Sequence, residues 1–200
     1  MEILAIVLVA VWLYSLRVFH KAKLSFFKFL VGSVGMFLFM MWFIQPAATA
    51  PLAQLVTAVS GYVGDLTGMY EAYYQYAILF IQHNGQSISM YVDYECAGII
   101  EILAFVSLLW FYPVYSVTER FVLTLAGVLW VFLGNILRLV IIASLIYFFG
   151  NDIFFFAHAI FGRIVFYALT AVLYFNVFTK AHILRQKIGK FNYGNTRTDT

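Results

Sequence analysis

The sequence predicts an all-α integral membrane protein with about five transmembrane helices, an external amphipathic helix and a small β-hairpin. Of its 200 residues, 64% are hydrophobic and 10% are charged, whereas a soluble domain carries about 25% charged residues. Too few polar side chains are present to cover a water-facing surface, so much of the surface must face lipid. Long apolar runs separated by short basic turns predict the spans, and one Asn-Gly pair between β-prone runs predicts the hairpin.

The apolar runs have the lengths of membrane spans, because roughly 17 to 25 residues cross the hydrocarbon core as a helix. We expect Pro113 to end the third span and Thr118 to cap the fourth. The fourth run is longer than one span requires, and the sequence leaves open whether residues 135–149 continue the helix or bend along the membrane. The predicted spans are residues 3–19, 24–44, 97–113, 121–149 and 154–179.

A more polar segment, residues 47–95, lies between the second and third spans and is expected to be external. Its first part, residues 50–64, is mildly amphipathic, which is typical of a helix lying in the membrane interface. The pair Asn84-Gly85 separates residues 77–82 from residues 87–92, and both of these runs are β-prone. Asn-Gly between such runs predicts a β-hairpin with a two-residue turn.

The distribution of basic residues predicts the orientation, because cytoplasmic loops of membrane proteins are enriched in Lys and Arg. Placing the turn at residues 17–28 in the cytoplasm puts all of the 12 Lys and Arg residues there except Arg138 and Arg163. We expect Arg163 to anchor at the membrane interface. The N-terminus is then outside and the C-terminus cytoplasmic. Residues 1–188 form one multi-pass membrane domain, and the polar residues 189–200 predict a disordered cytoplasmic tail.

This topology brings three unusual residues to a similar depth near the outer face. Cys96, the only cysteine of the chain, opens the third span at its outer end. Arg138 lies on the rising fourth span, about 26 Å beyond Phe121 at 1.5 Å per residue. His158 lies in the first turns of the descending fifth span. We therefore expect the three side chains to meet near the outer interface.

Together these side chains have the chemistry required for acyl transfer by a thiol. A thiolate is a strong nucleophile, and a helix N-terminus or a nearby cation lowers its pKa. His158 can take and return a proton near neutral pH, and Arg138 can stabilise a developing oxyanion or the thiolate. Asp93 and Glu95 lie beside Cys96 and oppose its ionisation, so Arg138 and the helix end must outweigh two acids.

Each residue also has an ordinary structural interpretation. Cys96 can be a small buried hydrophobe, and His158 a packed or interfacial histidine. Arg138 can pair with Glu101 or extend toward the interface. Asn135 suits either support of the site or packing between helices. Under this interpretation the protein is a non-catalytic membrane transport or assembly protein.

Several other classes of site and function are disfavoured. A single cysteine excludes an internal disulfide and a multi-cysteine metal site. Cys96 and His158 fall short of the three protein ligands of a catalytic zinc ion, so we expect no metal and predict no other cofactor. Nucleic-acid binding has little support, because the basic residues lie where the membrane topology requires them. The sequence does not determine the oligomeric state.

Three short motifs resemble those of exosortases and archaeosortases. Glu95-Cys96-Ala97-Gly98 resembles their Cys-(Ser/Ala)-Gly motif. Asn135-Ile-Leu-Arg138-Leu-Val resembles their Asn-x-x-Arg-(Ile/Val) motif, with Leu139 in the apolar position. His158-Ala-Ile-Phe-Gly162-Arg-Ile-Val-Phe166 resembles their His-x-x-x-Gly-x-x-x-Phe motif. The motifs occur in the family's order, the resemblance covers roughly residues 80–170, and the short chain resembles the compact Gram-positive branch called exosortase G.

The resemblance implies a membrane-embedded cysteine transpeptidase or protease of the bacterial cytoplasmic membrane, with its active site at the outer face. Its substrates would be membrane-tethered secreted proteins whose C-terminal signal consists of a short motif, a transmembrane helix and a basic cluster. Cys96 would be the nucleophile that forms an acyl-thioester, His158 the general acid and base, and Arg138 the stabiliser of the oxyanion or thiolate. Gly98 and Gly162 would have supporting roles. The acyl group would pass to a lipid or another envelope acceptor.

Overall fold

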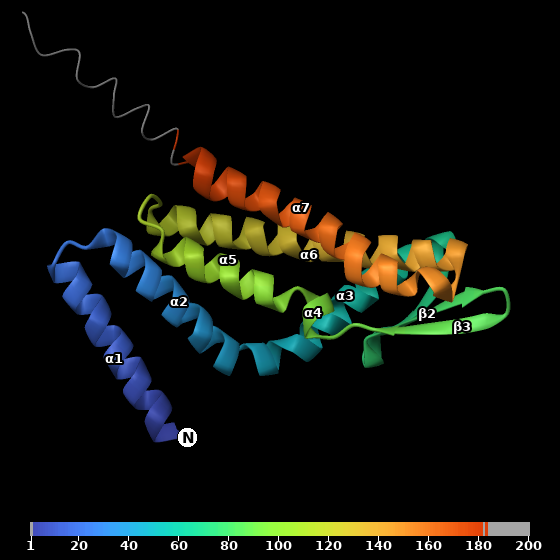
Figure 1. The fold of residues 1–200 in the computed structure, drawn as a ribbon, viewed down its shortest axis with the longest axis horizontal. Coiled ribbons are helices and arrows are strands. Elements are labelled where there is room, and N and C mark those ends of the chain that lie inside the picture. The colour runs from blue at the N-terminus through green and yellow to red at the C-terminus, as the bar shows by residue number, and fades with distance from the viewer. Residues whose placement is uncertain (1, 182, 184–200) are drawn as a thin grey trace, which may run out of the picture.

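Helices account for most of the chain in the computed structural model, which describes residues 2–181 and 183 (Figure 1). The predicted disordered tail, residues 189–200, lies outside the described residues. The α-helices are α1 (Glu2–Lys21), α2 (Ser25–Phe43), α3 (Gln45–Thr67), α4 (Tyr94–Ala97), α5 (Ile99–Phe111), α6 (Val117–Phe149) and α7 (Gly162–Tyr174). The strands are β1 (Tyr70–Tyr73), β2 (Ile78–His83) and β3 (Gln86–Tyr91). The short helical segments are η1 (Tyr74–Tyr76), η2 (Asn151–Ile153), η3 (Phe156–Phe161) and η4 (Phe175–Lys180).

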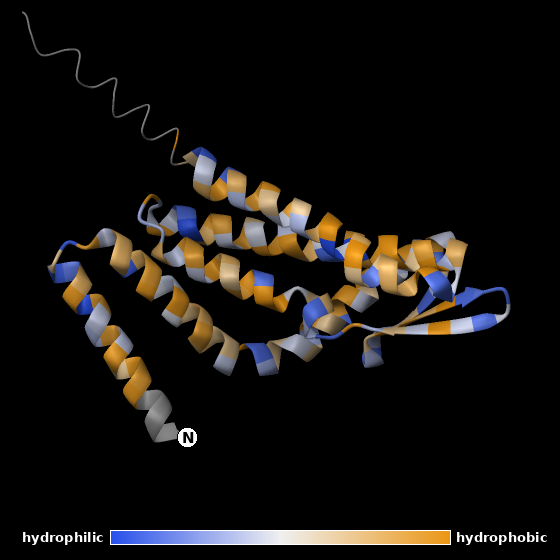
Figure 2. Ribbon diagram, in the orientation of Figure 1, coloured by the Kyte–Doolittle hydropathy of each residue, from blue (hydrophilic) through white to orange (hydrophobic). Residues whose placement is uncertain are grey.

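The bundle is formed by α5, α6 and α7 lying side by side, with α2 packed on α5 and α1 folded back along α2 (Figure 1). Hydrophobic residues line the helices of the bundle along their length, whereas hydrophilic residues are frequent in the hairpin (Figure 2). Within the described residues, three helical segments are long and apolar enough to cross a membrane: Ser25–Phe43, Val117–Phe149 and Asn151–Lys180. The predicted number of five spans is therefore not confirmed.

The predicted third span is shorter in the structure than in the sequence analysis. Gly98 adopts a left-handed conformation (φ 76°) and separates α4 from α5. The remaining helix, α5, has 13 residues, a length of about 20 Å at 1.5 Å per residue. A bilayer core is about 30 Å thick, so α5 alone does not cross it. The break also sets the direction of the backbone just after Cys96.

In α6 the structure answers the question left open by the sequence, because residues 135–149 continue one helix of 33 residues. Its N-terminus corrects one prediction: Ser116, not Thr118, is the cap. The Ser116 side chain accepts a hydrogen bond from the Glu119 backbone N–H, and the Glu119 carboxylate accepts one from the Ser116 N–H. This reciprocal arrangement gives hydrogen-bond acceptors to two backbone N–H groups at the start of the helix. With a cap at Thr118 these two groups would lack those acceptors.

The predicted hairpin is present, and a third strand extends it. Asn84 and Gly85 have positive φ values of 47° and 78°, as a two-residue turn of this type requires. The sequence analysis missed β1, which pairs antiparallel with β2 in a sheet ordered β1-β2-β3. The predicted interfacial helix at residues 50–64 lies within the longer α3, which packs on β1. Contact is close because a Cβ atom on Gly64 would lie 2.5 Å from the Tyr70 carbonyl oxygen.

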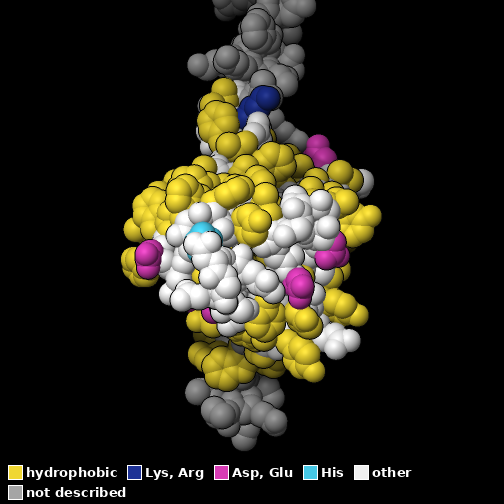
Figure 3. Space-filling view, turned by 90° about the vertical axis from the view of Figure 1, so that its right-hand side faces the viewer, with side chains coloured by type: hydrophobic (Ala, Val, Ile, Leu, Met, Phe, Trp, Pro, Cys, Tyr) yellow, Lys and Arg dark blue, Asp and Glu magenta, His cyan; other side chains and the backbone are white. Residues whose placement is uncertain are grey.

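Two hydrophobic clusters meet at the middle of α6. One lies between α3, the sheet and the C-terminal half of α6, and it includes Cys96 and Leu139. The other lies inside the bundle and includes Phe105 and Phe166. The end of the molecule that carries the hairpin has a polar centre with acidic side chains and a histidine, surrounded by hydrophobic side chains (Figure 3). Such a polar cap bordered by apolar side chains suits the boundary between membrane and water.

Candidate active site

Cys96 lies on α4, the single helical turn between β3 and α5. Asp93 caps this turn, since its carboxylate accepts a hydrogen bond from the Cys96 backbone N–H at 3.0 Å. The Cys96 side chain is buried, with 2% of its surface exposed. The thiol therefore lies in the core and not on an open surface. The turn that carries it is capped by Asp93 before it and ends at Gly98 after it.

The structure brings together the three residues that the sequence analysis placed at one depth. Cys96 Sγ lies 3.7 Å from His158 Nε2. Arg138 Nη2 lies 4.0 Å from the same sulfur atom. These residues come from α4, η3 and α6, so the site forms where three helical segments converge. A distance of 3.7 Å between sulfur and nitrogen permits proton exchange along a hydrogen bond.

Arg138 is held by contacts on two sides of its guanidinium group. Nη1 donates a hydrogen bond to the Glu95 carbonyl oxygen at 3.3 Å. The guanidinium carbon lies 5.7 Å from the centre of the Phe166 ring, within range of a cation–π interaction. Arg138 is 3% exposed and its Nε has no hydrogen-bond partner among the described residues. The buried charge is thus oriented toward the thiol by a carbonyl group and an aromatic ring.

The supporting residues predicted from the motifs, Asn135, Gly98 and Gly162, contact the segments that carry Cys96 and His158. Asn135 is buried and its Nδ2 donates a hydrogen bond to the Cys96 carbonyl oxygen. Gly98 faces Asn135, and a Cβ atom there would lie 3.5 Å from the Asn135 side chain. Gly162 faces Ile142, and a Cβ atom there would lie 2.6 Å from the Ile142 side chain. Asn135 therefore holds the backbone of α4, while Gly162 permits the segment that carries His158 to pack closely on α6.

Burial controls the ionisation of the thiol. Loss of solvent raises the pKa of Cys96 from 9.0 to about 11, Arg138 opposes this rise, and Asp93 and Glu95 add to it. Arg138 is the largest of the neighbouring charge effects on the thiol, but burial has a still larger effect and the pKa stays raised. At neutral pH the thiol keeps its proton, so it could act as a nucleophile only if a nearby base took that proton.

His158 is the group in a position to do so. Its ring stacks on Phe154 with the ring centres 5.8 Å apart and the planes inclined by 2°. This stacking fixes the plane in which Nε2 points at the sulfur. Nδ1 is buried and has no hydrogen-bond partner among the described residues. In many thiol and serine sites the second nitrogen is oriented by a carboxylate, and no carboxylate of the described residues accepts a hydrogen bond from His158 Nδ1.

The alternative pairing of Arg138 with Glu101 does not occur. In the part of the chain that the structure describes, the one ion pair within 4.0 Å joins Arg163 Nη2 to Glu95 Oε2 at 3.2 Å. Glu101 Oε2 is buried and has no hydrogen-bond partner in the described part of the chain. Arg163 links the start of α7 to the turn that carries Cys96, and its expected place at the membrane interface stays a prediction. Sequence analysis missed this pair because the two residues are far apart in the chain.

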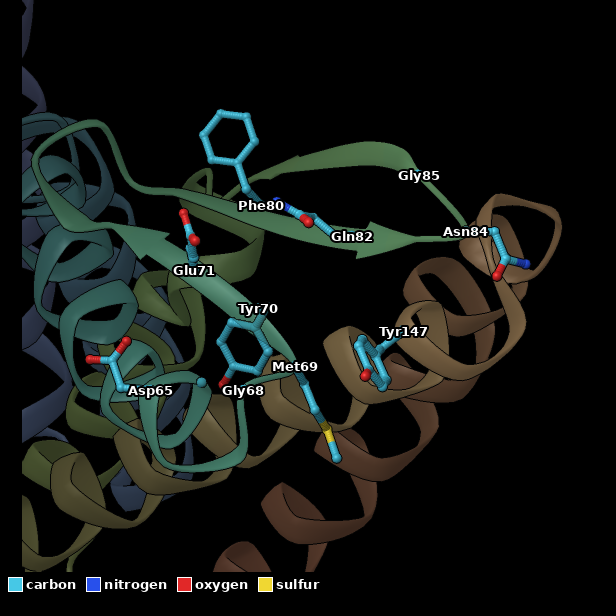
Figure 4. Close-up of a pocket in the computed structure, with 11 residues that line it drawn as sticks. Asp65, Gly68, Met69, Tyr70, Glu71, Phe80, Gln82, Asn84, Gly85 and Tyr147 are labelled. Atoms are coloured by element: carbon cyan, nitrogen blue, oxygen red, sulfur yellow. The ribbon is translucent and has the colours of Figure 1, made fainter.

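A separate cavity of about 570 Å³ lies between the end of α3, the sheet and the end of α6 (Figure 4). Asp65, Glu71 and Tyr147 are among its lining residues, but Cys96, Arg138 and His158 are not. This cavity is therefore not at the thiol. Within the described residues, no group of three or more His, Cys, Asp and Glu side chains is arranged to hold a metal ion.

The family model described as transmembrane exosortase matches residues 1–175. The chain belongs to the transmembrane exosortase family. The match includes the N-terminal helices as well as the region of the three motifs. No curated protein and no solved structure matches the chain. Membership in the exosortase family, together with the long apolar helices, indicates a membrane protein and suggests a membrane transpeptidase. The match is to the family as a whole, so the exosortase G-like branch stays a prediction.

Proposed function

We propose that this protein is a cysteine transpeptidase that cleaves the C-terminal sorting signals of membrane-tethered secreted proteins and transfers them to an envelope acceptor. The observation that carries the proposal is the approach of His158 Nε2 and Arg138 Nη2 to Cys96 Sγ, at 3.7 and 4.0 Å. The three residues are supplied by distant parts of the chain. Burial of an arginine in an apolar bundle costs free energy, so its presence beside a thiol and an imidazole points to a function.

In the first half of the reaction, Cys96 Sγ attacks the carbonyl carbon of the scissile peptide bond while His158 Nε2 takes the thiol proton. Charge develops on the carbonyl oxygen, and the Arg138 guanidinium stabilises it. When the carbon–nitrogen bond breaks, the imidazolium returns its proton to the leaving nitrogen. The products are a thioester on Cys96 and a released transmembrane segment with a new amine terminus.

In the second half, an acceptor hydroxyl or amine attacks the thioester carbonyl and gives its proton to His158. The carbon–sulfur bond breaks, and the sulfur recovers a proton from the imidazolium. Atoms and charges balance without a metal, an oxidant or a cofactor. Because the resting thiol is protonated (its pKa is about 11), His158 acts as a general base and the resting site holds no thiolate–imidazolium pair.

Helix length supports a site at the outer face of the bacterial cytoplasmic membrane. Arg138 lies about 32 Å from the start of α6 at 1.5 Å per residue, which is close to the roughly 30 Å thickness of the bilayer core. α6 continues beyond Arg138 to Phe149, beside the hairpin, and this end of the molecule is polar and acidic (Figure 3). A substrate anchored by its own helix presents its scissile bond at a constant depth. Confinement to the membrane plane then supplies much of the required proximity.

One observation favours a second candidate, a non-catalytic transport or assembly protein. Cys96 is 2% exposed, as expected of a cysteine that only fills space. Under this hypothesis Cys96→Ala cells process every secreted protein normally. Under the proposed function those cells accumulate precursors that retain the C-terminal helix and basic cluster. Quantitative proteomics of membranes from wild-type and Cys96→Ala cells separates the two, and unchanged precursor levels would reject the transpeptidase.

A further inference from the structure

Strand β3 forms one edge of the sheet, because the strand order is β1-β2-β3. Apart from β2, none of the described elements packs on β3 over more than a slight contact. Natural edge strands are usually protected by Lys, Pro or a bulge, since open edges pair with other chains. Residues 86–91, Gln-Ser-Ile-Ser-Met-Tyr, contain neither Lys nor Pro, and their pairing with β2 is continuous. The β3 edge is thus open and unprotected.

The register identifies the backbone groups that are open. Beyond the end of the hairpin, the Val92 N–H donates a hydrogen bond to the Ala77 carbonyl at 2.8 Å, toward the β2 side. In an antiparallel pair, the hydrogen-bonded residues alternate along the strand. Backbone groups of Ser87, Ser89 and Tyr91 therefore point away from β2. These three residues define the β3 edge, and their side chains are exposed.

The β3 edge leads directly to the thiol. Tyr91 is followed by Val92 and Asp93, and Asp93 caps the turn that carries Cys96. The edge spans about 13 Å from residue 87 to residue 91, at 3.3 Å per residue. On the exposed face beside Ser87, Phe80 and Tyr73 line a shallow cavity of about 430 Å³. An extended chain on this edge would have backbone partners along the strand and a hollow for side chains on one face.

We propose that the β3 edge binds the extended segment of the substrate that precedes the scissile bond, as an added parallel strand of about five residues. This inference rests on the proposed function. β3 runs from the hairpin turn toward Cys96. A secreted substrate runs from the outside toward its membrane helix, so both chains reach the thiol in the same direction. Parallel pairing follows from that shared direction.

The proposed pairing has two consequences for the reaction. Recognition through backbone groups tolerates varied side chains, while the hollow beside Phe80 favours an apolar residue at alternate positions. The paired segment is the acyl part of the substrate. It stays bound after the transmembrane part leaves, which holds the thioester at Cys96 for the acceptor. A second copy of this chain, paired edge to edge, is the competing occupant, and the experiment distinguishes it.

The first test uses a photo-crosslinking amino acid at Ser87 or Ser89 in full-length Cys96→Ala protein in its host membrane, where uncleaved substrate persists. The matched control carries the same amino acid at Asn151, an exposed residue of the same end of the molecule. We expect positions 87 and 89 to capture the precursors that accumulate in Cys96→Ala cells, with their C-terminal signals intact, and position 151 to capture none. Capture of a second copy of the chain, or of no precursor, would overturn the proposal.

The second test is Ser89→Pro in the otherwise intact enzyme. Proline removes the outward N–H of residue 89 and leaves the hydrogen bonds to β2 in place. We expect the rate of precursor processing to fall about fivefold for the loss of one hydrogen bond. Asn151→Pro, at the first position of η2 where proline fits, is expected to process at the wild-type rate.

The two proposals fail in different ways. If Cys96→Ala cells accumulate no precursor, the transpeptidase proposal fails. If they do, and either positions 87 and 89 capture no precursor or folded Ser89→Pro processes at the wild-type rate, only strand addition fails. Protein abundance and the alkylation rate of Cys96 report whether Ser89→Pro has folded. If it has not, the crosslinking result decides alone.

Discussion

The most direct prediction concerns the ionisation of Cys96. With a pKa of about 11, about one thiol in ten thousand is ionised at pH 7, compared with about one in a hundred for a thiol at its ordinary value of 9.0. Alkylation proceeds through the thiolate. Cys96 should therefore react about a hundredfold more slowly at pH 7 than an exposed thiol, before burial of the sulfur is considered.

Asp93→Asn is the perturbation that tests the cause. Asparagine caps a helix as well as aspartate does, so the turn should persist. Removal of the carboxylate charge takes away one contribution that raises the pKa of the Cys96 thiol. The pH profile of alkylation should therefore move to lower pH in the variant, with protein abundance unchanged.

The assay is straightforward because the chain contains one cysteine. Purified protein in nanodiscs is treated with an iodoacetamide reagent from pH 7 to 11, and mass spectrometry gives the rate of modification. The rate should rise about tenfold per pH unit up to about pH 11. A Cys96→Ala, Ser87→Cys protein provides an exposed thiol for comparison. A wild-type profile that levels off below about pH 8.5 would show a resting thiolate and refute the general-base mechanism.

Three further predictions follow from the packing and charge of the site. Arg138→Lys should reduce the rate of precursor processing by roughly a hundredfold or more, because an ammonium group cannot donate to the Glu95 carbonyl, stack on Phe166 and face the oxyanion together; normal processing would exclude Arg138 from catalysis. Gly64→Ala should lower stability by about 1 to 2 kcal/mol, since its Cβ would lie 2.5 Å from a backbone oxygen, whereas Gly134→Ala, with its nearest neighbour at 3.4 Å, should gain up to about 1 kcal/mol from helix propensity; equal melting temperatures would contradict both. Finally, the raised pKa of Cys96 makes the folded state prefer the neutral thiol, so this stabilisation is complete below about pH 9 and is lost as pH rises toward 11; thermal melting should show up to about 3 kcal/mol more destabilisation across that range in the wild type than in Cys96→Ala.

The three central residues of the candidate site could be predicted from the sequence. Cys96, Arg138 and His158 were selected because each is rare in an apolar run, and helix direction with a rise of 1.5 Å per residue placed them at one depth. The structure brings their side chains within 4.0 Å of the sulfur. Depth along a bundle follows from sequence position, because the bilayer keeps the helices roughly parallel.

Other parts of the site depend on lateral packing, which the sequence does not reveal. The ion pair between Arg163 and Glu95 joins segments far apart in the chain, and Gly162 lets the first of them pack closely on α6. The contact of Phe166 with Arg138 depends on the same packing. The high pKa of Cys96 depends on how completely its neighbours exclude water. Burial is a sum over many distant residues, so adjacent charges alone do not predict the pKa of this thiol.

The sequence by itself determined the environment, the helical class, the hairpin turn and the three residues that meet at the thiol. The low content of charged residues predicts a membrane environment. The period and length of the apolar runs predict the helices and strands. Only the tertiary structure revealed β1, the break at Gly98, the unbroken course of α6 and the open β3 edge. The pairing of β1 and the place of β3 at the sheet edge depend on contacts between strands, which local sequence patterns do not specify. The tertiary structure also decided that the lone cysteine is a buried thiol with a raised pKa beside a histidine, because burial is a property of the folded chain.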